Sequence, residues 1–187
     1  MKRLLLPVVL MLMLCACESA APPVRESVAE FWQRTGSVSA EVAVRAEFDD
    51  YAVDFRMDCA YSDGRCSVTV TEPAEIGGVE ILVEENGLTV EYAGSSIEAG
   101  EGGISPATVF AELVRVWKNG YISENGTEKD DGQKLISTVH SSGQYEYRTL
   151  FSAESFAPVS AEIYLDGKRI ISCTFEQVTF GEMSISE

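Results

Sequence analysis

The chain has 187 residues, of which 30 are acidic and 14 are basic, so its formal net charge at pH 7 is −16. This balance excludes the basic surface on which nucleic-acid binding depends, and anionic lipid headgroups would repel it. The length is sufficient for one domain with a substantial hydrophobic core.

The first predicted element is a signal peptide. Lys2 and Arg3 precede an uncharged run, residues 4–14, which is too short to span a bilayer because a transmembrane helix needs about 20 apolar residues. The run ends in Leu14-Cys15-Ala16-Cys17, which resembles the bacterial lipobox. The resemblance implies cleavage before Cys17 and attachment of a diacylglycerol, with acyl chains such as palmitate, to its thiol.

The lipobox assigns residues 1–16 to the signal peptide and residues 17–23 to a short tether between Cys17 and the folded domain. Cleavage of an ordinary secretory peptide after Ala20 or Ala21 is the alternative. Loss of residues 1–16 removes two cations and no acids, so the formal charge changes from −16 to −18. We therefore expect an extracytoplasmic protein that is held by its acyl chains, on a cell membrane rather than an outer membrane.

The expected domain begins with a helix at about Val24–Arg34, whose apolar residues form one stripe. They are Val24, Val28, Phe31 and Trp32. The apolar period then changes to two, which predicts strands over about Val38–Phe48 and Tyr51–Tyr61. A two-residue turn at Asp49-Asp50 would place Phe48 opposite Tyr51, so that the apolar sets of both strands share one face.

The alternating pattern continues through most of the remaining chain. It predicts strands at about Cys66–Val70, Val79–Val83, Leu88–Tyr92, Tyr121–Glu124, Lys134–Ser141, Tyr145–Ser152, Val159–Leu165 and Arg169–Phe180. Turns are expected at Asn86-Gly87, Asp131-Gly132 and Asp166-Gly167. A second helix interrupts the strands, with Ser105 as its cap, Pro106 in its first turn and Gly120 at its end.

This order of elements predicts an α+β fold with about ten antiparallel strands. Such a meander suits a long, strongly curved sheet with the two helices packed on its concave face. We expect residues 24–187 to form this single domain.

The pattern resembles the LolA/LolB superfamily of bacterial lipoprotein carriers. The resemblance rests on the N-terminal helix, the meander, the helix opened by Ser105-Pro106, the hairpin at Phe156–Gly167 and the closing strand at Cys173–Phe180. It implies an incomplete barrel with a helical lid. Within the superfamily, the chain is most similar to lipid-anchored spore-germination lipoproteins of the GerS type.

The resemblance implies two functions, neither of them enzymatic. Germination lipoproteins bind and support a cell-wall amidase that processes spore peptidoglycan, and this is the function that we expect. The alternative is a carrier or acceptor of lipoprotein acyl chains, or of another apolar ligand, in a cavity between the helices and the sheet.

Membrane-anchored carriers have an apolar residue on a protruding loop, and Asp49-Asp50 offers none. The nearest substitute is Ile76, which could equally be a buried lead-in to a strand. Arg45 is a candidate for the arginine of a carrier cavity by position alone. Its alternation within the strand instead favours a cation on the outer face.

The sequence contains one histidine, His140, on which any Ser-His or Cys-His mechanism would depend. Its neighbour Ser141 would point to the opposite face of a strand, which is poor geometry for a nucleophile and its base. We expect a surface or edge histidine, no enzyme activity and no cofactor. The cysteines lack the paired spacing of a zinc site, so no metal is expected.

Cys59 and Cys66 form a candidate disulfide. A four-residue loop at Tyr61–Gly64 would place them directly opposite each other on the apolar face, at a separation close to disulfide distance. The alternative is two buried free thiols. Cys173 would then remain unpaired in the last strand.

Six aromatic side chains are expected between the helices and the sheet. They are Phe31, Trp32, Phe55, Phe110, Trp117 and Tyr147. They would fill a core, or some of them would line a cavity if an apolar ligand binds.

Overall fold

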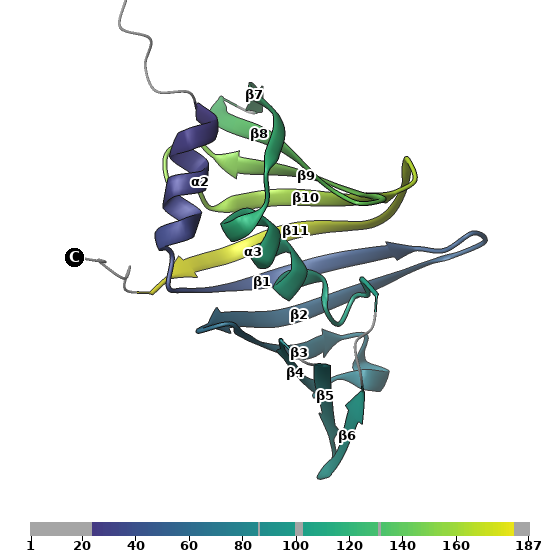
Figure 1. Ribbon diagram of the computed structural model, residues 1–187. Coiled ribbons are helices and arrows are strands. Elements are labelled where there is room, and N and C mark those ends of the chain that lie inside the picture. The colour runs from purple at the N-terminus through teal and green to yellow at the C-terminus, as the bar shows by residue number, and fades with distance from the viewer. Residues whose placement is uncertain (1–23, 86, 100–102, 131, 182–187) are drawn as a thin grey trace, which may run out of the picture.

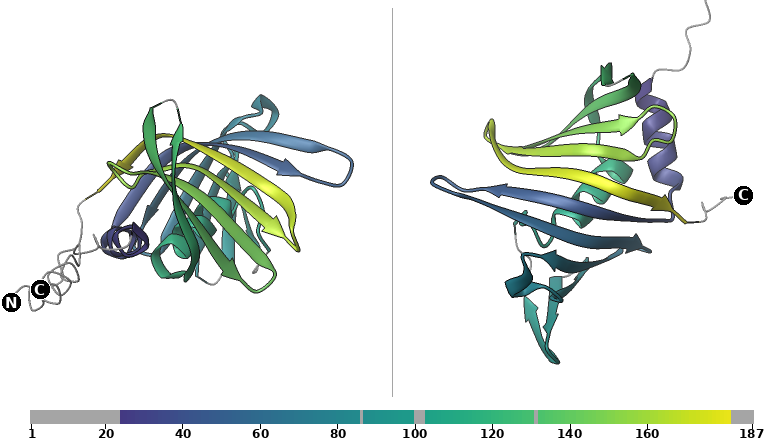
Figure 2. Two further views of the ribbon diagram at one scale, coloured as in Figure 1. Left: turned by 90° about the horizontal axis from the view of Figure 1, so that it is seen from above. Right: turned by 180° about the vertical axis from the view of Figure 1, so that it is seen from behind.

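The computed structural model describes residues 24–85, 87–99, 103–130 and 132–181. Within these ranges, eleven antiparallel strands form one sheet, and two α-helices lie on the same face of it (Figures 1 and 2). The expected fold class, a long curved antiparallel sheet with two helices, is confirmed. The predicted signal peptide, the tether and Cys17 lie outside the described residues.

The α-helices are α2 (Val24–Arg34) and α3 (Val109–Asn119), and η1 (Ala74–Ile76) is a short 3-10 helix. The strands are β1 (Ser37–Glu47), β2 (Ala52–Ser62), β3 (Arg65–Glu72), β4 (Glu80–Glu84), β5 (Gly87–Tyr92), β6 (Ser95–Ala99), β7 (Ile122–Asp130), β8 (Gln133–Ser142), β9 (Tyr145–Ser152), β10 (Pro158–Leu165) and β11 (Lys168–Phe180).

The strand order is β6-β5-β4-β3-β2-β1-β11-β10-β9-β8-β7. Because the first and last strands pair at the middle of the sheet, β6 and β7 form its two edges although they are consecutive strands in the chain. Their connection has to cross the sheet. In Figure 1, α3 lies on this crossing path, over the middle of the concave face.

Buried and exposed residues alternate along the strands, so that one face of the sheet forms the core. In β1, every second residue from Val38 to Ala46 is at most 5% exposed and faces the helices. The Asp49-Asp50 turn is confirmed: the Phe48 amide donates to the Tyr51 carbonyl at 2.8 Å. The predicted hairpin at Asp166-Gly167 is also present, with Leu165 opposite Lys168.

Two boundaries and one strand differ from the expected elements. The second helix starts at Val109, because Ser105 to Thr108 form a separate turn in which the Ser105 amide donates to the Thr108 hydroxyl. β6 was not expected, and β7 is longer than predicted. Both are edge strands, and residues of β7 after Ile122 are exposed, so neither shows the alternation that signals a half-buried strand. Asn86 and Asp131 of two predicted turns lie outside the described residues.

The register expected for Cys59 and Cys66 is wrong. The turn between β2 and β3 has two residues, Asp63 and Gly64, both with positive φ, so Tyr61 lies opposite Cys66 and Cys59 lies opposite Val68. The two cysteines are therefore diagonal neighbours, about 7–8 Å apart between Cα atoms, which exceeds the usual disulfide range. Cys59, Cys66 and Cys173 are free and buried.

We expect all three thiols to be free in solution. The test uses a lipid-free chain, which starts at residue 17 and carries Cys17→Ser. Intact mass should show three alkyl groups added in denaturant without reductant. Native alkylation should be slow, because burial raises the pKa of the Cys66 and Cys173 thiols to about 12. One group before reduction and three after it would instead demonstrate a Cys59–Cys66 bridge.

Candidate functional site

The concave face of the sheet is filled where the helices cover it. Trp32 of α2 and Trp117 of α3 are 0% and 2% exposed, and their ring centroids are 4.7 Å apart. Phe110 and Tyr147, also expected between the helices and the sheet, are 1% exposed. Phe31 and Phe55 are half-buried and pack against this core. In this part of the site, aromatic side chains occupy the space that an apolar ligand would need.

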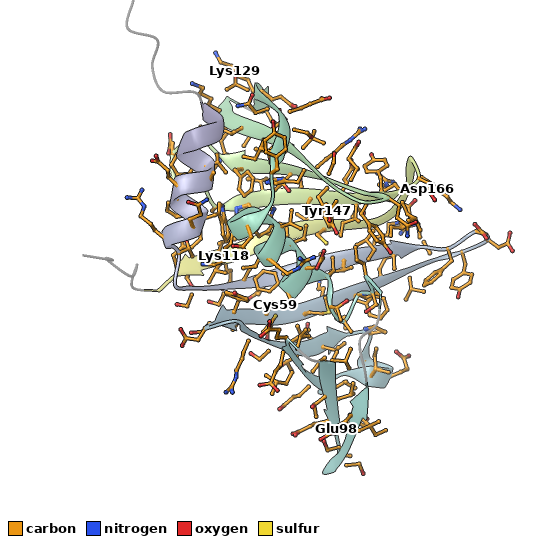
Figure 3. The ribbon with its side chains drawn as sticks, in the orientation of Figure 1. Cys59, Glu98, Lys118, Lys129, Tyr147 and Asp166 are labelled. Atoms are coloured by element: carbon orange, nitrogen blue, oxygen red, sulfur yellow. The ribbon has the colours of Figure 1, made fainter. Side chains whose placement is uncertain are left out.

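Polar contacts also tie α3 to its neighbours. The Tyr147 hydroxyl donates to the Glu112 carboxylate at 2.7 Å, and the Trp117 indole donates to Thr149 at 3.0 Å. Lys118, in the last turn of α3, donates to the carbonyls of Trp32 and Thr35, where α2 ends. Figure 3 shows Tyr147 on the sheet and Lys118 between the helices. The two helices are therefore linked to each other and to the sheet.

Burial sets the protonation of these groups. It raises the pKa of the Tyr147 hydroxyl, and the bond to the Glu112 carboxylate raises it further, so Tyr147 remains a donor at neutral pH. Burial lowers the pKa of Lys118. Glu112 also accepts from Arg115 at 2.6 Å, and this contact raises the pKa of the guanidinium. Glu112 thus joins a cation at the surface to a buried phenol.

The expectation that His140 lies at the surface or edge is wrong. Its side chain is 2% exposed, because β8 lies between β7 and β9 and the imidazole faces the end of α3. Its Nδ1 atom has no hydrogen-bond partner among the described residues. Burial lowers its pKa to about 4. Ser141 is exposed, as expected for a neighbour on the opposite face of the strand.

Gly120, which follows α3, lies where the neighbouring atoms leave no room for a side chain. Its backbone is extended, with φ −73° and ψ 150°, so no unusual conformation demands glycine. A Cβ atom at this position would lie 2.5 Å from the Val116 carbonyl oxygen and 3.0 Å from Cδ2 of His140. The close packing of His140 thus depends on the absence of a side chain at Gly120.

Beyond α3 the concave face becomes progressively exposed. One row of directly opposed residues crosses β2 to β6. It consists of Cys59, Val68, Ile81, Val90 and Ile97. The first three are at most 6% exposed, Val90 is half-buried and Ile97 is 67% exposed. In Figure 1, β5 and β6 lie at the lower end of the sheet, away from both helices.

We call the exposed end of this face the apolar strip. It comprises Val83, Leu88, Val90, Tyr92 and Ile97. Tyr92 is 50% exposed, and Val83, Leu88 and Val90 are half-buried. The sequence indicated apolar residues here, but their position near the β6 edge, which leaves them only partly covered, is visible only in the sheet order.

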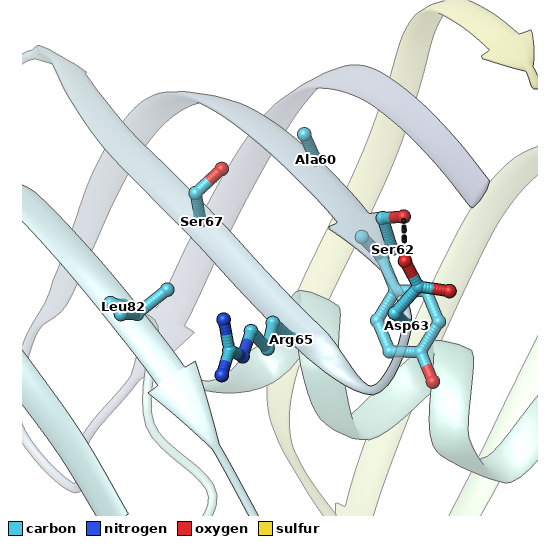
Figure 4. Close-up of a pocket in the computed structure, with 7 residues that line it drawn as sticks. Ala60, Ser62, Asp63, Arg65, Ser67 and Leu82 are labelled. Carbon is cyan, nitrogen blue, oxygen red and sulfur yellow. Dashed lines mark hydrogen bonds between the residues drawn. The ribbon is translucent and has the colours of Figure 1, made fainter.

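A groove of about 540 Å³ lies on the opposite, convex face of β2, β3 and β4 (Figure 4). Its lining is formed by Ala60, Tyr61, Ser62, Asp63, Arg65, Ser67 and Leu82. Arg65 pairs with Glu84 at 2.9 Å, and Leu82 is 39% exposed. The groove lacks converging buried polar groups and is separated from the apolar strip by the sheet itself.

The structure also places the two remaining candidate residues from the sequence, Arg45 and Ile76. Arg45 is exposed on the outer face and pairs with Asp54 at 2.9 Å, so it does not enter the concave side. Ile76 is 37% exposed in η1 and is not a buried strand lead-in. Sequence reasoning predicted the turn at Asp49-Asp50 but missed that its flanking aromatic residues are exposed. Phe48 and Tyr51 stack there with ring centroids 4.7 Å apart, at 48% and 62% exposure.

Two other kinds of site are absent from the described residues. No cluster of three or more His, Cys, Asp or Glu side chains in these ranges could hold a metal ion. No helix in the same ranges combines the length and apolar character needed to cross a membrane.

Neither a protein-family model nor a curated protein sequence matches this chain. Solved structures do. An uncharacterized conserved protein from Thermus thermophilus is similar with a TM-score of 0.53 and 9% identity, over 85% of this chain and 86% of that one. The shared feature is the fold.

Two further structures are similar at lower scores. A LolA superfamily protein from Nitrosomonas europaea has a TM-score of 0.46 and 14% identity, over 86% of this chain and 93% of its own. The lipoprotein LppX from Mycobacterium tuberculosis has a TM-score of 0.47 and 15% identity, over 87% and 96%.

Acidification should destabilise the protein through His140. The folded protein keeps the imidazole neutral down to a pKa of about 4, whereas the unfolded chain takes up the proton near pH 6.5. The free energy of unfolding should therefore fall between pH 6.5 and 4, by up to about 1.4 kcal/mol per pH unit from this group. In His140→Leu, urea unfolding should show a shallower dependence. Parallel curves for the two proteins would contradict this assignment.

Lys118→Met should lower the free energy of unfolding by about 1–2 kcal/mol, because the carbonyls at the end of α2 lose their charged donor. Lys129→Met is the matched control, since Lys129 is exposed on β7 (Figure 3). Urea unfolding of both variants provides the measurement. Equal effects would mean that only the loss of a cation matters.

Proposed function

We propose that this protein is a non-enzymatic lipoprotein of the cell envelope that binds a partner protein through the apolar strip. The observation that carries the proposal is the change in exposure along one face, from Cys59 at 3% to Ile97 at 67%. Contiguous apolar surface of this kind is typical of interaction sites. The covered part of the face is already filled by aromatic side chains, so the strip is where a partner can bind without displacing α3.

The position of the strip favours a partner away from the anchor. The proposed lipidated Cys17 precedes α2 by only a short tether, which extends to at most roughly 20 Å. In Figure 1, the start of α2 and the β5–β6 hairpin lie at opposite ends of the molecule. If the tether holds the start of α2 near the membrane, the strip faces outward, toward the cell wall.

A cell-wall amidase in spore peptidoglycan processing is the partner that the GerS-type sequence resemblance suggests. A supporting role is compatible with the structure, since the one histidine is buried and its Nδ1 atom has no partner among the described residues. The acidic surface, with a formal charge of −16 for the whole chain, would favour a partner with a basic contact surface.

A second candidate function is the carriage of acyl chains or another apolar ligand. It is favoured by the continuity of the opposed row, which runs without a break from Ile97 at the surface to Cys59 in the core. Movement of α3 would extend the strip into a longer apolar trough. That movement requires the contacts of Tyr147, Trp117 and Lys118 to break.

Val90→Ser and Leu82→Ser test the proposal as a matched pair. Leu82 lies on β4, next to Val90 on β5, but on the convex face. The lipid-free chain and both variants would be used as bait in cell-envelope extract, and affinity for the recovered partner would then be measured. Val90→Ser should weaken binding about tenfold, because apolar contact is lost, and Leu82→Ser should have no effect.

Native mass spectrometry of the lipid-free chain separates the two candidate functions. A ligand-free protein that binds its partner through Val90 supports partner binding. Stoichiometric phospholipid or acylated peptide would favour the carrier. Equal loss of binding in Val90→Ser and Leu82→Ser would exclude the apolar strip as the site.

A further inference from the structure

The two edges of the sheet are differently protected. β7 carries charges of both signs, including Glu124, Glu128 and Lys129, and its pairing with β8 is interrupted by a register shift after Ile122. Charged side chains and bulges are the usual means of preventing an edge from pairing with another strand. β6 has the sequence Ser-Ser-Ile-Glu-Ala, with Glu98 as its single charge, and pairs with β5 in continuous register.

The two faces of the β6 edge differ in chemistry. On the concave side, Ile97 lies opposite Val90 and extends the apolar strip. On the convex side, Glu98 lies near Glu91, which is directly opposite Glu80 on β4. All three carboxylates are exposed, and no ion pair found among the described residues includes them. Figure 3 shows Glu98 on β6, at the far end of the sheet from Lys129 on β7.

We propose that β6 pairs with an extended segment of the partner protein in which apolar and basic residues alternate. Successive side chains of a strand point to opposite faces, so an added strand would place one set beside Ile97 and the other beside Glu98. Apolar residues fit the first position and Lys or Arg the second. Main-chain hydrogen bonds supply affinity in this binding mode, and the alternating side chains supply specificity.

Charge argues against a second copy of this chain as the occupant. Pairing of β6 with β6 would bring the acidic convex faces of two copies together, and like charges on neighbouring strands are destabilising. The formal charge of each copy, −18 without residues 1–16, adds to this repulsion. A basic segment meets neither obstacle.

The inference rests on the proposed function, because the added strand would extend the apolar strip by one row. It also specifies the chemistry of the partner segment, which is an alternation of apolar and basic residues. A segment of about five residues, matching the length of β6, would suffice to cover the edge.

Two fluorescent peptides of one composition test the proposal with the lipid-free chain. One alternates three Lys with three Val, and the other has the same residues in two blocks. Anisotropy should show binding of the alternating peptide at least about tenfold tighter than that of the block peptide. Hydrogen exchange of the β6 amides should slow when the alternating peptide binds, with no change in β7.

Charge reversal on the two edges provides the matched control. Glu98→Lys should weaken peptide binding about tenfold, whereas Glu128→Lys, the same charge change on β7, should leave it unchanged. Equal binding of both peptides, equal effects of both variants, or unprotected β6 amides would overturn the inference. Detection of a homodimer by native mass spectrometry, together with protection of its β6 amides from hydrogen exchange, would also overturn the inference.

The outcome is separable from that of the proposed function. If edge pairing fails but Val90→Ser still weakens binding of the partner from envelope extract, the apolar strip stands and only the strand pairing is wrong. If Val90→Ser has no effect either, both proposals fail.

Discussion

The antiparallel pairing of β1 with β11 determines the arrangement of the rest of the molecule. This pairing joins the beginning and the end of the folded chain at the centre of the sheet, as in the register of Val44 with Cys173. The sheet edges are consequently β6 and β7, which are neighbours in sequence. Their connection crosses the concave face, and it carries α3 there. The helical cover is thus a consequence of strand order as well as of the apolar stripe of α3.

Because α3 crosses the middle of the concave face, it shields some apolar residues of that face from solvent and leaves others exposed. Val68 and Ile81 are almost fully buried, whereas Val90 and Ile97, the next two residues of the same row, are half-buried and exposed. Burying apolar surface contributes roughly 25 cal/mol per Å², so the uncovered end represents binding energy that the isolated domain does not use. This difference is the physical basis of the proposed partner site.

The part of the concave face that the helices cover contains buried polar atoms that lower the stability of the fold. Trp32 Nε1, Thr138 Oγ1 and His140 Nδ1 are buried without a hydrogen-bond partner in the part of the chain that the structure describes. An unsatisfied buried polar group costs about 1–3 kcal/mol. By contrast, Trp117 and Tyr147 find partners in Thr149 and Glu112. Apolar packing, with a few well-placed hydrogen bonds, therefore holds the helices down, and protonation of His140 would act directly on that packing.

The sequence by itself determined the local elements of this protein. Alternation in Val38–Ala46, the turn at Asp49-Asp50 and the stripe of α3 follow from backbone periodicity and turn chemistry, which act between residues close in the chain. The opposition of Cys59 to Val68 is also local, because it follows from a two-residue turn where four were expected, and such a change shifts every opposed pair while leaving the apolar pattern of each strand unaltered. Only the tertiary structure decided which strands form the edges and why His140 is buried, because both depend on contacts between segments far apart in the chain.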